Sequence, residues 1–215
     1  MLIAPSMLSA DFLNLGADVD FVSREADIFH LDIMDGTFVP NISFGFPVVE
    51  AIAARAEKPL DAHLMIVNPG TYIERFAKVG VDMLSFHYEA AGEESLNLID
   101  RIHSYDIKAG IAINPDVPVE KIFPLLSEVD FVLIMSVFAG FGGQKFMPES
   151  LGRIAAVKAE LLRRGESHVL IEVDGGVAPS NASALREAGA DILVAGSSVF
   201  NASDRAAAIK AMKFC

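Results

Sequence analysis

Residues 29–36, FHLDIMDG, combine the apolar character of a buried strand with ionisable side chains at His30 and Asp32. Burying an unpaired charge is costly, so both groups need partners. Residues two apart on a strand point to the same face, which makes His30 and Asp32 neighbours. The spacing therefore predicts a shared polar partner. Asp35-Gly36 is instead typical of a turn in which Asp35 bonds to nearby backbone.

Two further residues could form a reactive or metal-binding site together with His30 and Asp32. His63 lies late in an apolar run at 59–66, and Asp174 lies near the end of another at 168–175. Two imidazoles and two carboxylates suit a divalent ion such as Zn, Fe, Mn or Co better than Ca. Any one of these residues alone is more often a satisfied core histidine or a turn-capping aspartate. Their joint position at strand ends favours the metal site.

Glycine-rich loops form the second constellation. They are GFGGQKF at 140–146, DGG at 174–176 and GSS at 196–198. Glycine lets backbone amides approach an anion closely. Phosphate sites of α/β barrels commonly follow the last two strands. The pattern predicts a phosphate cradle at Gly175, Gly176, Gly196 and Ser197, with Lys145 expected to be solvated.

These residues are carried by a regular alternation of elements. Eight β-type runs are found at 2–8, 27–34, 59–66, 82–88, 107–114, 130–137, 168–175 and 191–197. A segment with helical apolar spacing follows each of them, at 15–26, 46–57, 71–80, 95–105, 119–128, 151–165, 180–189 and 203–213. Several β runs are apolar throughout, as in parallel strands covered on both faces.

Eight such units predict a (β/α)₈ TIM barrel, with residues 1–215 as a single domain. An open doubly wound sheet would show the same alternation. The barrel requires catalytic groups at the C-terminal ends of its strands. His30, Asp32, His63 and Asp174 fulfil that requirement, and His87, Glu89 and Ser136 also close predicted strands.

Composition excludes several classes of protein. The 215 residues have a net charge of −12, which argues against a nucleic-acid binder. Hydrophobic residues make up 52% and the mean hydropathy is +0.41, so a sizeable core is expected. No apolar run approaches membrane-spanning length, and no signal peptide is visible. The one cysteine, Cys215, excludes an internal disulfide and suits a cytoplasmic location.

Six blocks together resemble the ribulose-phosphate 3-epimerase family, nearly end to end and in order. They are APSMLSADF, HLDIMDGTFVPNISFG, LDAHLMI, GFGGQKF, IEVDGG and VAGSSVF. The resemblance implies a (β/α)₈ barrel that inverts C3 of a phosphorylated ketose with one divalent metal ion. We also expect a homo-oligomer.

The resemblance also assigns roles to residues. It implies His30, Asp32, His63 and Asp174 as metal ligands, and Asp32 and Asp174 as the catalytic acid/base residues. Positions that match substrate contacts are Ser6, His63, Gly140, Phe141, Gly142, Gly143, Gly175, Gly176, Gly196 and Ser197. Met34, Met65 and Met135 match methionines that line the family's active site, although core packing explains methionines equally well.

The chemistry of an epimerase fits these residues. Epimerisation beside a ketone removes a proton from one face and returns one to the other, so two carboxylates on opposite faces are needed. The enediolate between these steps gains negative charge, which a metal stabilises as a Lewis acid. A polarisable methionine wall would suit that intermediate.

One departure from the family pattern leaves the substrate open. The family usually has a polar-Pro pair before the glycine loop, where this chain has Phe138-Ala139. The first hypothesis is an epimerase of D-ribulose 5-phosphate and D-xylulose 5-phosphate. The second is an epimerase of a hexulose 6-phosphate such as allulose 6-phosphate. The third is a sugar-phosphate-binding barrel or a lyase or decarboxylase, whose relatives typically have an Asp-x-Lys that is absent at Asp32-Ile33-Met34.

Overall fold

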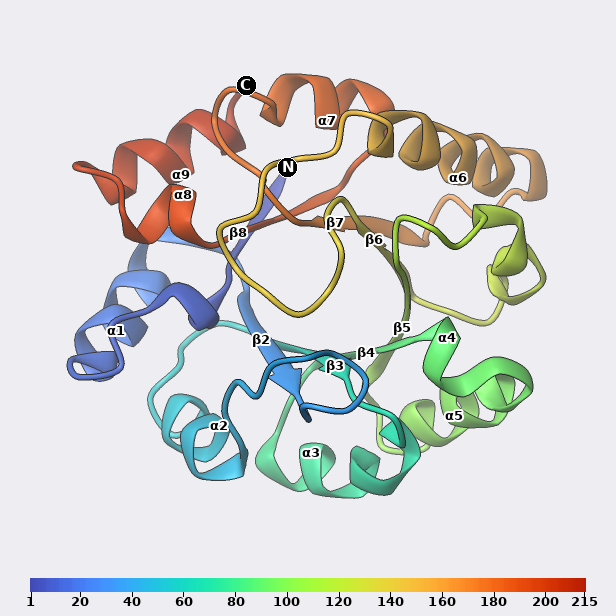
Figure 1. Ribbon diagram of the computed structural model, residues 1–215, viewed down its shortest axis with the longest axis horizontal. Coiled ribbons are helices and arrows are strands. Elements are labelled where there is room, and N and C mark those ends of the chain that lie inside the picture. Colours follow the sequence, from blue (N-terminus) through green and yellow to red (C-terminus); the bar gives the residue numbers. More distant parts are fainter.

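Eight parallel strands curve into a barrel inside a ring of helices in the computed structural model, which describes residues 1–215 (Figure 1). The fold is the predicted (β/α)₈ TIM barrel. The strands are β1 Leu2–Pro5, β2 Phe29–Met34, β3 Leu60–Met65, β4 Met83–His87, β5 Lys108–Ile113, β6 Phe131–Met135, β7 Leu170–Asp174 and β8 Ile192–Ala195. Each strand lies where a β-type run was predicted.

The sheet runs in the order β1-β8-β7-β6-β5-β4-β3-β2, which excludes the doubly wound alternative. The two end strands meet through a parallel bridge between Ser6 and His30. The amides of Asp27 and Ile28 also donate to the carbonyl of Ile3. These contacts nearly close the barrel and bring Ser6 beside β2.

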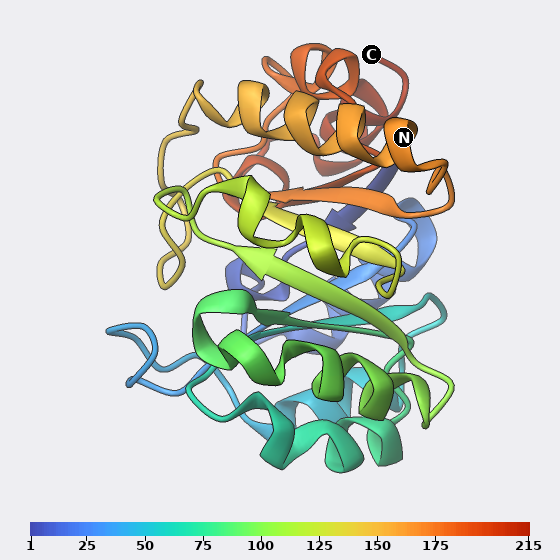
Figure 2. The same ribbon diagram turned by 90° about the vertical axis from the view of Figure 1, so that its right-hand side faces the viewer.

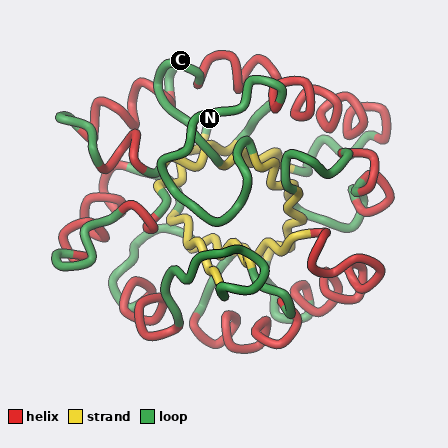
Figure 3. The backbone as a smooth tube through the Cα atoms, viewed as in Figure 1, coloured by secondary structure: helices red, strands yellow, loops and turns green.

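Helices cover the outside of the barrel (Figure 3). They are α1 Leu15–Glu25, α2 Phe46–Ala53, α3 Ile73–Val79, α4 Tyr88–Ala91, α5 Ser95–His103, α6 Ser150–Arg164, α7 Ala182–Ala188, α8 Ser197–Phe200 and α9 Arg205–Lys213. Short 3₁₀ turns lie at Met7–Ser9, Pro69–Tyr72, Gly92–Glu94, Val119–Lys121 and Phe123–Leu125. None of these helices has the length and hydrophobicity that a membrane span requires.

Helix α6 shows how sequence specifies this layer. Ile154, Val157 and Leu161 recur at helical spacing and are buried against the barrel. The helix ends at Gly165, whose φ of 78° gives the left-handed C-terminal cap that glycine adopts without strain.

The barrel interior is filled at its N-terminal end by apolar side chains. The ring of Phe131 lies against Gly110 of the neighbouring strand, where a Cβ atom would come within 2.3 Å of the ring. Glycine at this position therefore makes room for the phenylalanine. The opposite end of the barrel, toward which the strand arrows point, carries long loops after β2 and β6 (Figure 2).

The segment 119–128, predicted as one helix, was the clearest error of prediction. It forms two 3₁₀ turns at Val119–Lys121 and Phe123–Leu125. Pro124 has no amide proton and its ring clashes with a helical carbonyl four residues earlier, so an α-helix cannot run through it. The first β-type run is also shorter than predicted, because Met7–Ser9 turns away from the barrel.

Candidate active site

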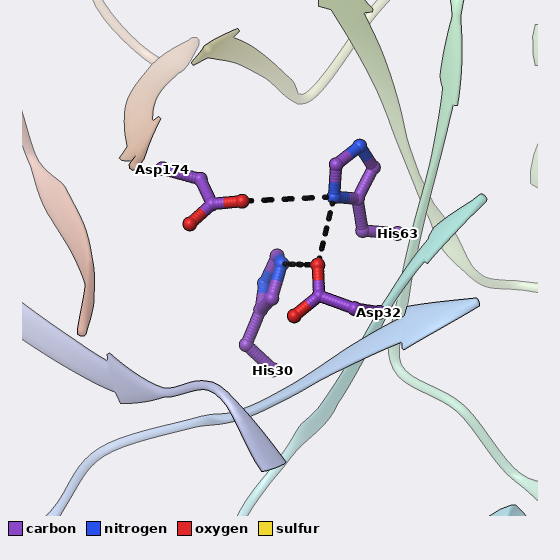
Figure 4. Close-up of side chains that lie close together, drawn as sticks. All are labelled: His30, Asp32, His63 and Asp174. Carbon is purple, nitrogen blue, oxygen red and sulfur yellow. Dashed lines mark hydrogen bonds and ion pairs between the residues drawn. The ribbon is translucent and has the colours of Figure 1, made fainter. Parts of the chain in front are cut away.

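His30, Asp32, His63 and Asp174 converge inside the C-terminal mouth of the barrel (Figure 4). One ligand atom from each lies within 4.8 Å of all the others. His63 Nδ1 is 3.3 Å from Asp32 Oδ1 and 3.9 Å from Asp174 Oδ2, while His30 Nε2 is 3.4 Å from Asp32 Oδ1. The four residues singled out from the sequence therefore share one site.

Strand register places these side chains. Asp32 of β2 pairs directly with His63 of β3 in the parallel ladder. Asp174 is the last residue of β7, paired with Met135 of β6. Both histidine side chains are fully buried, whereas Asp174 is 17% exposed. The carboxylate of Asp174 is thus the most exposed of the four side chains.

The two aspartates have opposite electrostatic environments. Burial opposes ionisation of Asp32, but His30 and His63 outweigh it and hold the pKa of Asp32 below its usual value. Burial and the neighbouring charge of Asp32 raise the pKa of Asp174 to about 7. Two carboxyl groups with separated pKa values are the arrangement expected of an acid/base pair.

A second layer of carboxylates lies beneath the first. Asp61 and Glu172 are fully buried. His30 Nδ1 donates to Asp61 Oδ2 at 2.5 Å and lies 3.5 Å from Glu172 Oε1. Burial disfavours a charged His30, but Asp32 and Asp61 outweigh it and raise its pKa well above the usual value.

This second layer was not predicted from the sequence, although a signal was present. Asp61 lies two residues before His63, and Glu172 lies two residues before Asp174. The same period-two rule that paired His30 with Asp32 places each of these carboxylates on the inner face.

The donor set fits a divalent metal ion. His30 Nε2 is buried without a hydrogen-bond partner, because Asp61 engages only the other ring nitrogen. That unpaired nitrogen faces the carboxylate of Asp32. Two imidazole nitrogens and two carboxylate oxygens are ligands that Zn, Fe, Mn and Co accept.

A pocket with about 540 Å³ of empty volume, partly open to solvent, lies above the cluster. Its lining includes Ser6, Asp32, Met34, Met65, Met135, Gly140, Phe141, Gly142, Gly143, Asp174, Gly175, Gly176, Gly196 and Ser197. Of the residues predicted for the site, His30 and His63 alone are not in the lining. They lie below it, fully buried.

Close backbone packing requires the glycines on one side of this pocket. A Cβ atom at Gly176 would lie 2.3 Å from the amide nitrogen of Phe146. One at Gly196 would lie 2.6 Å from Ser9 Oγ. Helix α8 begins at Ser197. The amides of Val199 and Phe200 donate to the carbonyl of Gly196, whereas the amides of Ser197 and Ser198 precede the first bond of the helix.

Three other residues considered in the sequence can be placed in the structure. The hydroxyl of Ser6 donates to Asp32 Oδ2 at 2.5 Å. Asp35 Oδ1 accepts from the amides of Thr37 and Phe38, which confirms the predicted turn. Lys145 is exposed and absent from the pocket lining, as expected.

Several lining residues had not been predicted, among them Leu8, Ser9, Val137 and Gln144. Phe138 and Ala139, noted only as a departure from a pattern, line the pocket as well. Ser9 belongs to the 3₁₀ turn after β1, and no sequence signal distinguished it from an ordinary turn serine.

Solved structures confirm the architecture of the chain. KGPDC from Streptococcus mutans has a TM-score of 0.72 at 14% identity, covering 99% of this chain and 95% of that one. 3-Hexulose-6-phosphate synthase from Salmonella typhimurium has a TM-score of 0.68 at 15% identity, covering 99% and 96%. At such low identity these likenesses show the fold alone.

Relatives found by sequence identify the family as well as the fold. A ribulose-phosphate 3-epimerase of Bacillus subtilis is 46% identical over 98% of this chain and 97% of its own length. The cytoplasmic isoform from Oryza sativa subsp. japonica is 43% identical over 98% of this chain and 92% of its own. A model of the ribulose-phosphate 3 epimerase family matches residues 2–200. The chain therefore belongs to the ribulose-phosphate 3 epimerase family of isomerases.

Proposed function

We propose that this protein is a metal-dependent 3-epimerase that interconverts D-ribulose 5-phosphate and D-xylulose 5-phosphate. The observation that carries the proposal is the position of Asp32 and Asp174, which come from β2 and β7 and line one pocket above two buried histidines. The names of the relatives from Bacillus subtilis and rice support the same activity. The convergence of the four residues argues against a barrel that only binds sugar phosphates.

The proposed metal ligands are His30 Nε2, His63 Nδ1 and carboxylate oxygens of Asp32 and Asp174. A divalent ion bound there supplies Lewis-acid stabilisation of the negative charge that develops on the substrate oxygens. Asp61 holds the ring of His30 so that Nε2 faces the ligand cluster. The identity of the ion, among Zn, Fe, Mn and Co, is part of the proposal to be tested by metal analysis.

Asp32 and Asp174 are the proposed acid/base pair. Each removes or returns the C3 proton on its own face of the substrate, so that inversion needs both. Hydrogen bonding from Ser6 fixes the orientation of Asp32. Burial strengthens a carboxylate as a base, as the raised pKa of Asp174 indicates for the metal-free protein.

The phosphate is proposed to bind over the backbone of Gly175, Gly176, Gly196 and Ser197. Glycine at the first three positions allows close approach, and unpaired amides at the start of α8 can donate to anionic oxygens. Gly140, Phe141, Gly142 and Gly143 are proposed to cover the substrate from the β6 side. Ser6 and His63 complete the proposed contacts.

Met34, Met65 and Met135 are proposed to face the reacting carbon. All three line the pocket and are almost fully buried, with exposed fractions of 5%, 1% and 2%. Thioethers are polarisable and do not protonate. They would therefore exclude water without competing for the C3 proton.

A hexulose 6-phosphate is the second candidate substrate. It remains a candidate because Phe138 and Ala139 stand where the family usually has a polar-Pro pair. Phe138 is 50% exposed and lines the pocket, where it adds bulk on the side of the β6 loop. Turnover on a panel of phosphorylated ketoses tests the choice. We expect the largest kcat/KM with ribulose 5-phosphate, and a larger value with allulose 6-phosphate would overturn the assignment.

Metal dependence is tested on the same substrates. Removal of metal with a chelator should abolish epimerisation, and added divalent ions should restore it. Full activity of a protein with no bound metal would contradict the metal-dependent mechanism. We further propose a cytoplasmic homo-oligomer in which residues 1–215 form one catalytic domain, to be checked by fractionation and light scattering.

A further inference from the structure

Only one of the two ring nitrogens of His63, Nδ1, faces Asp32 and Asp174. Its Nε2 faces away and lies 2.9 Å from Nε2 of His87, which ends β4. The two ring planes differ by 25° and the ring centroids are 5.0 Å apart, so the rings meet edge to edge. His87 is fully buried. Within this pair one nitrogen donates the proton and the other accepts it.

The outer nitrogen of His87 lies between two groups of opposite character. Its Nδ1 is 3.5 Å from Glu89 Oε1 and 3.5 Å from Asn114 Nδ2. Asn114 Oδ1 already accepts from the amide of Ala139 at 2.9 Å, which fixes the orientation of the Asn114 amide group. Asn114 Nδ2 can therefore only donate to His87. An ionised Glu89 can only accept from it.

These contacts allow two directions of hydrogen bonding. In the first, Asn114 donates to His87, His87 donates to His63, and His63 carries a proton on Nδ1. In the second, His63 donates from Nε2 to His87, and His87 donates from Nδ1 to Glu89. Only the second direction leaves His63 Nδ1 with a free electron pair facing Asp32 and Asp174.

Glu89 can supply the acceptor that the second direction needs. In the second direction a bound ion takes the place of the contact between His63 Nδ1 and Asp32 Oδ1, which are 3.3 Å apart in the metal-free protein. Burial opposes ionisation of Glu89, but hydrogen bonds to His87 and the Asn114 amide hold its pKa below the usual value. Glu89 Oε1 accepts from the backbone amide of Asn114 at 2.9 Å, which fixes the carboxylate in place.

We propose that His87 is a positioning residue for the metal site, which accepts the Nε2 proton of His63 and passes a hydrogen bond on to Glu89. These hydrogen bonds hold His63 in the tautomer whose Nδ1 can bind an ion. The inference rests on the proposed metal site and adds two residues that do not touch the ion. Partners of metal-bound histidines typically affect metal affinity or activity by about 10–100-fold.

Three variants separate this role from simple packing. His87→Phe keeps an aromatic ring against Phe38, whose centroid lies 4.8 Å from that of His87, but removes the acceptor. His87→Gln restores an acceptor oxygen. Glu89→Gln replaces an obligate acceptor by a group that can donate to His87, and the exposed Glu93→Gln is its matched control.

Metal affinity of metal-free protein is measured by titration with Co²⁺, followed by its visible absorption, and with Zn²⁺ in competition. His87→Phe and Glu89→Gln should each weaken binding by about 10–100-fold, with His87→Gln recovering much of the loss and Glu93→Gln matching the wild type. If both His87→Phe and Glu89→Gln bind metal with wild-type affinity, the role inferred for His87 and Glu89 is wrong, while the proposed metal site stands. A wild-type protein that binds neither ion overturns the proposed metal site and this inference with it. If His87→Phe does not fold, the comparison of Glu89→Gln with Glu93→Gln decides.

A nitrogen-15 spectrum of the histidine rings gives a readout that packing would not move. In the Zn²⁺-bound wild type we expect the proton on Nε2 of His63 and on Nδ1 of His87. A proton on Nε2 of His87, with none on Nδ1, would show the opposite direction and overturn the proposal.

Discussion

Asp32 and Asp174 both approach one imidazole nitrogen, with His63 Nδ1 at 3.3 Å from the first carboxylate and 3.9 Å from the second. Their strands, β2 and β7, are not neighbours, because β1 and β8 separate them around the barrel. Two carboxylates held apart in this way can face opposite sides of a substrate. The same geometry brings both within reach of a single ion.

Asp61→Asn tests how much the second carboxylate layer contributes to the metal site. The side-chain amide oxygen of the variant can still accept from His30, but the negative charge that orients and polarises the ring is lost. We expect metal affinity to fall by about tenfold or more, measured by titration of metal-free protein. The control is Asp106→Asn, the same change at an exposed turn with φ of 59° that Asn tolerates. Equal affinities in the two variants would show that the orientation of His30 does not depend on Asp61.

Gly196→Asp tests the proposed phosphate cradle. The new side chain would place its Cβ 2.6 Å from Ser9 Oγ and add a negative charge beside the pocket. We expect KM to rise by at least tenfold, which corresponds to a loss of about 1.4 kcal/mol or more of substrate binding. Gly152→Asp makes the same change on α6, where a Cβ has open space, and should leave KM unchanged. An unchanged KM in Gly196→Asp would show that the substrate phosphate does not bind on this side of the pocket.

Much of this architecture was predictable because the signals are local. Parallel strands such as β6, FVLIM, are apolar on both faces, and the intervening helices repeat at helical spacing. His30 and Asp32 were identifiable because ionisable residues two apart in an apolar strand need a partner inside the barrel. Asp61 and Glu172 obey the same rule and could have been found by applying it to every strand.

Contacts between segments distant in sequence were not predictable. The hydrogen bond from the Ala139 amide to Asn114 Oδ1 depends on where two loops meet, 25 residues apart. This hydrogen bond could not form with proline at position 139, because proline has no amide proton to donate. The opposition of Nε2 atoms in His63 and His87 likewise depends on ring orientation, which no spacing rule specifies.

Glu172→Gln should change how the stability of the metal-free protein depends on pH. Burial and the charge of Asp61 raise the pKa of Glu172 from 4.5 to about 8. A carboxyl group with a raised folded-state pKa stabilises the fold below its unfolded pKa, and that stabilisation is lost as pH rises through the folded value. Glutamine does not ionise and so avoids the loss.

We therefore expect the melting temperature of wild-type protein to fall relative to Glu172→Gln between pH 5 and pH 9. A difference of roughly 1 kcal/mol corresponds to about 2–4 °C for a domain of this size. The measurement is thermal unfolding with chelator present at several pH values. Glu149→Gln, at an exposed position, should show no such trend. A constant offset between Glu172→Gln and wild type at every pH would mean that ionisation of Glu172 does not contribute.

Asp32→Asn and Asp174→Asn test the two-base mechanism directly. Each replacement nearly preserves shape while removing a proton-transfer group, and general acid–base groups typically contribute about 10²–10⁴-fold. Each variant should therefore lose at least about a hundredfold in kcat for epimerisation. Both residues are also proposed ligands, and an amide is a poorer ligand than a carboxylate, so metal content must be measured in the same samples.

Isotope exchange distinguishes the two bases where loss of turnover does not. If each aspartate serves one face of C3, a variant that keeps its metal still has the base that faces one epimer. In deuterated water that epimer should exchange its C3 hydrogen with solvent while inversion fails, and the other epimer should not exchange. Asp32→Asn and Asp174→Asn should then show opposite preferences, each exchanging the epimer that the other variant cannot. A metal-replete variant that epimerises near the wild-type rate would show that its aspartate is not one of the two bases, and exchange of the same epimer by both variants would require a third proton-transfer group in the pocket.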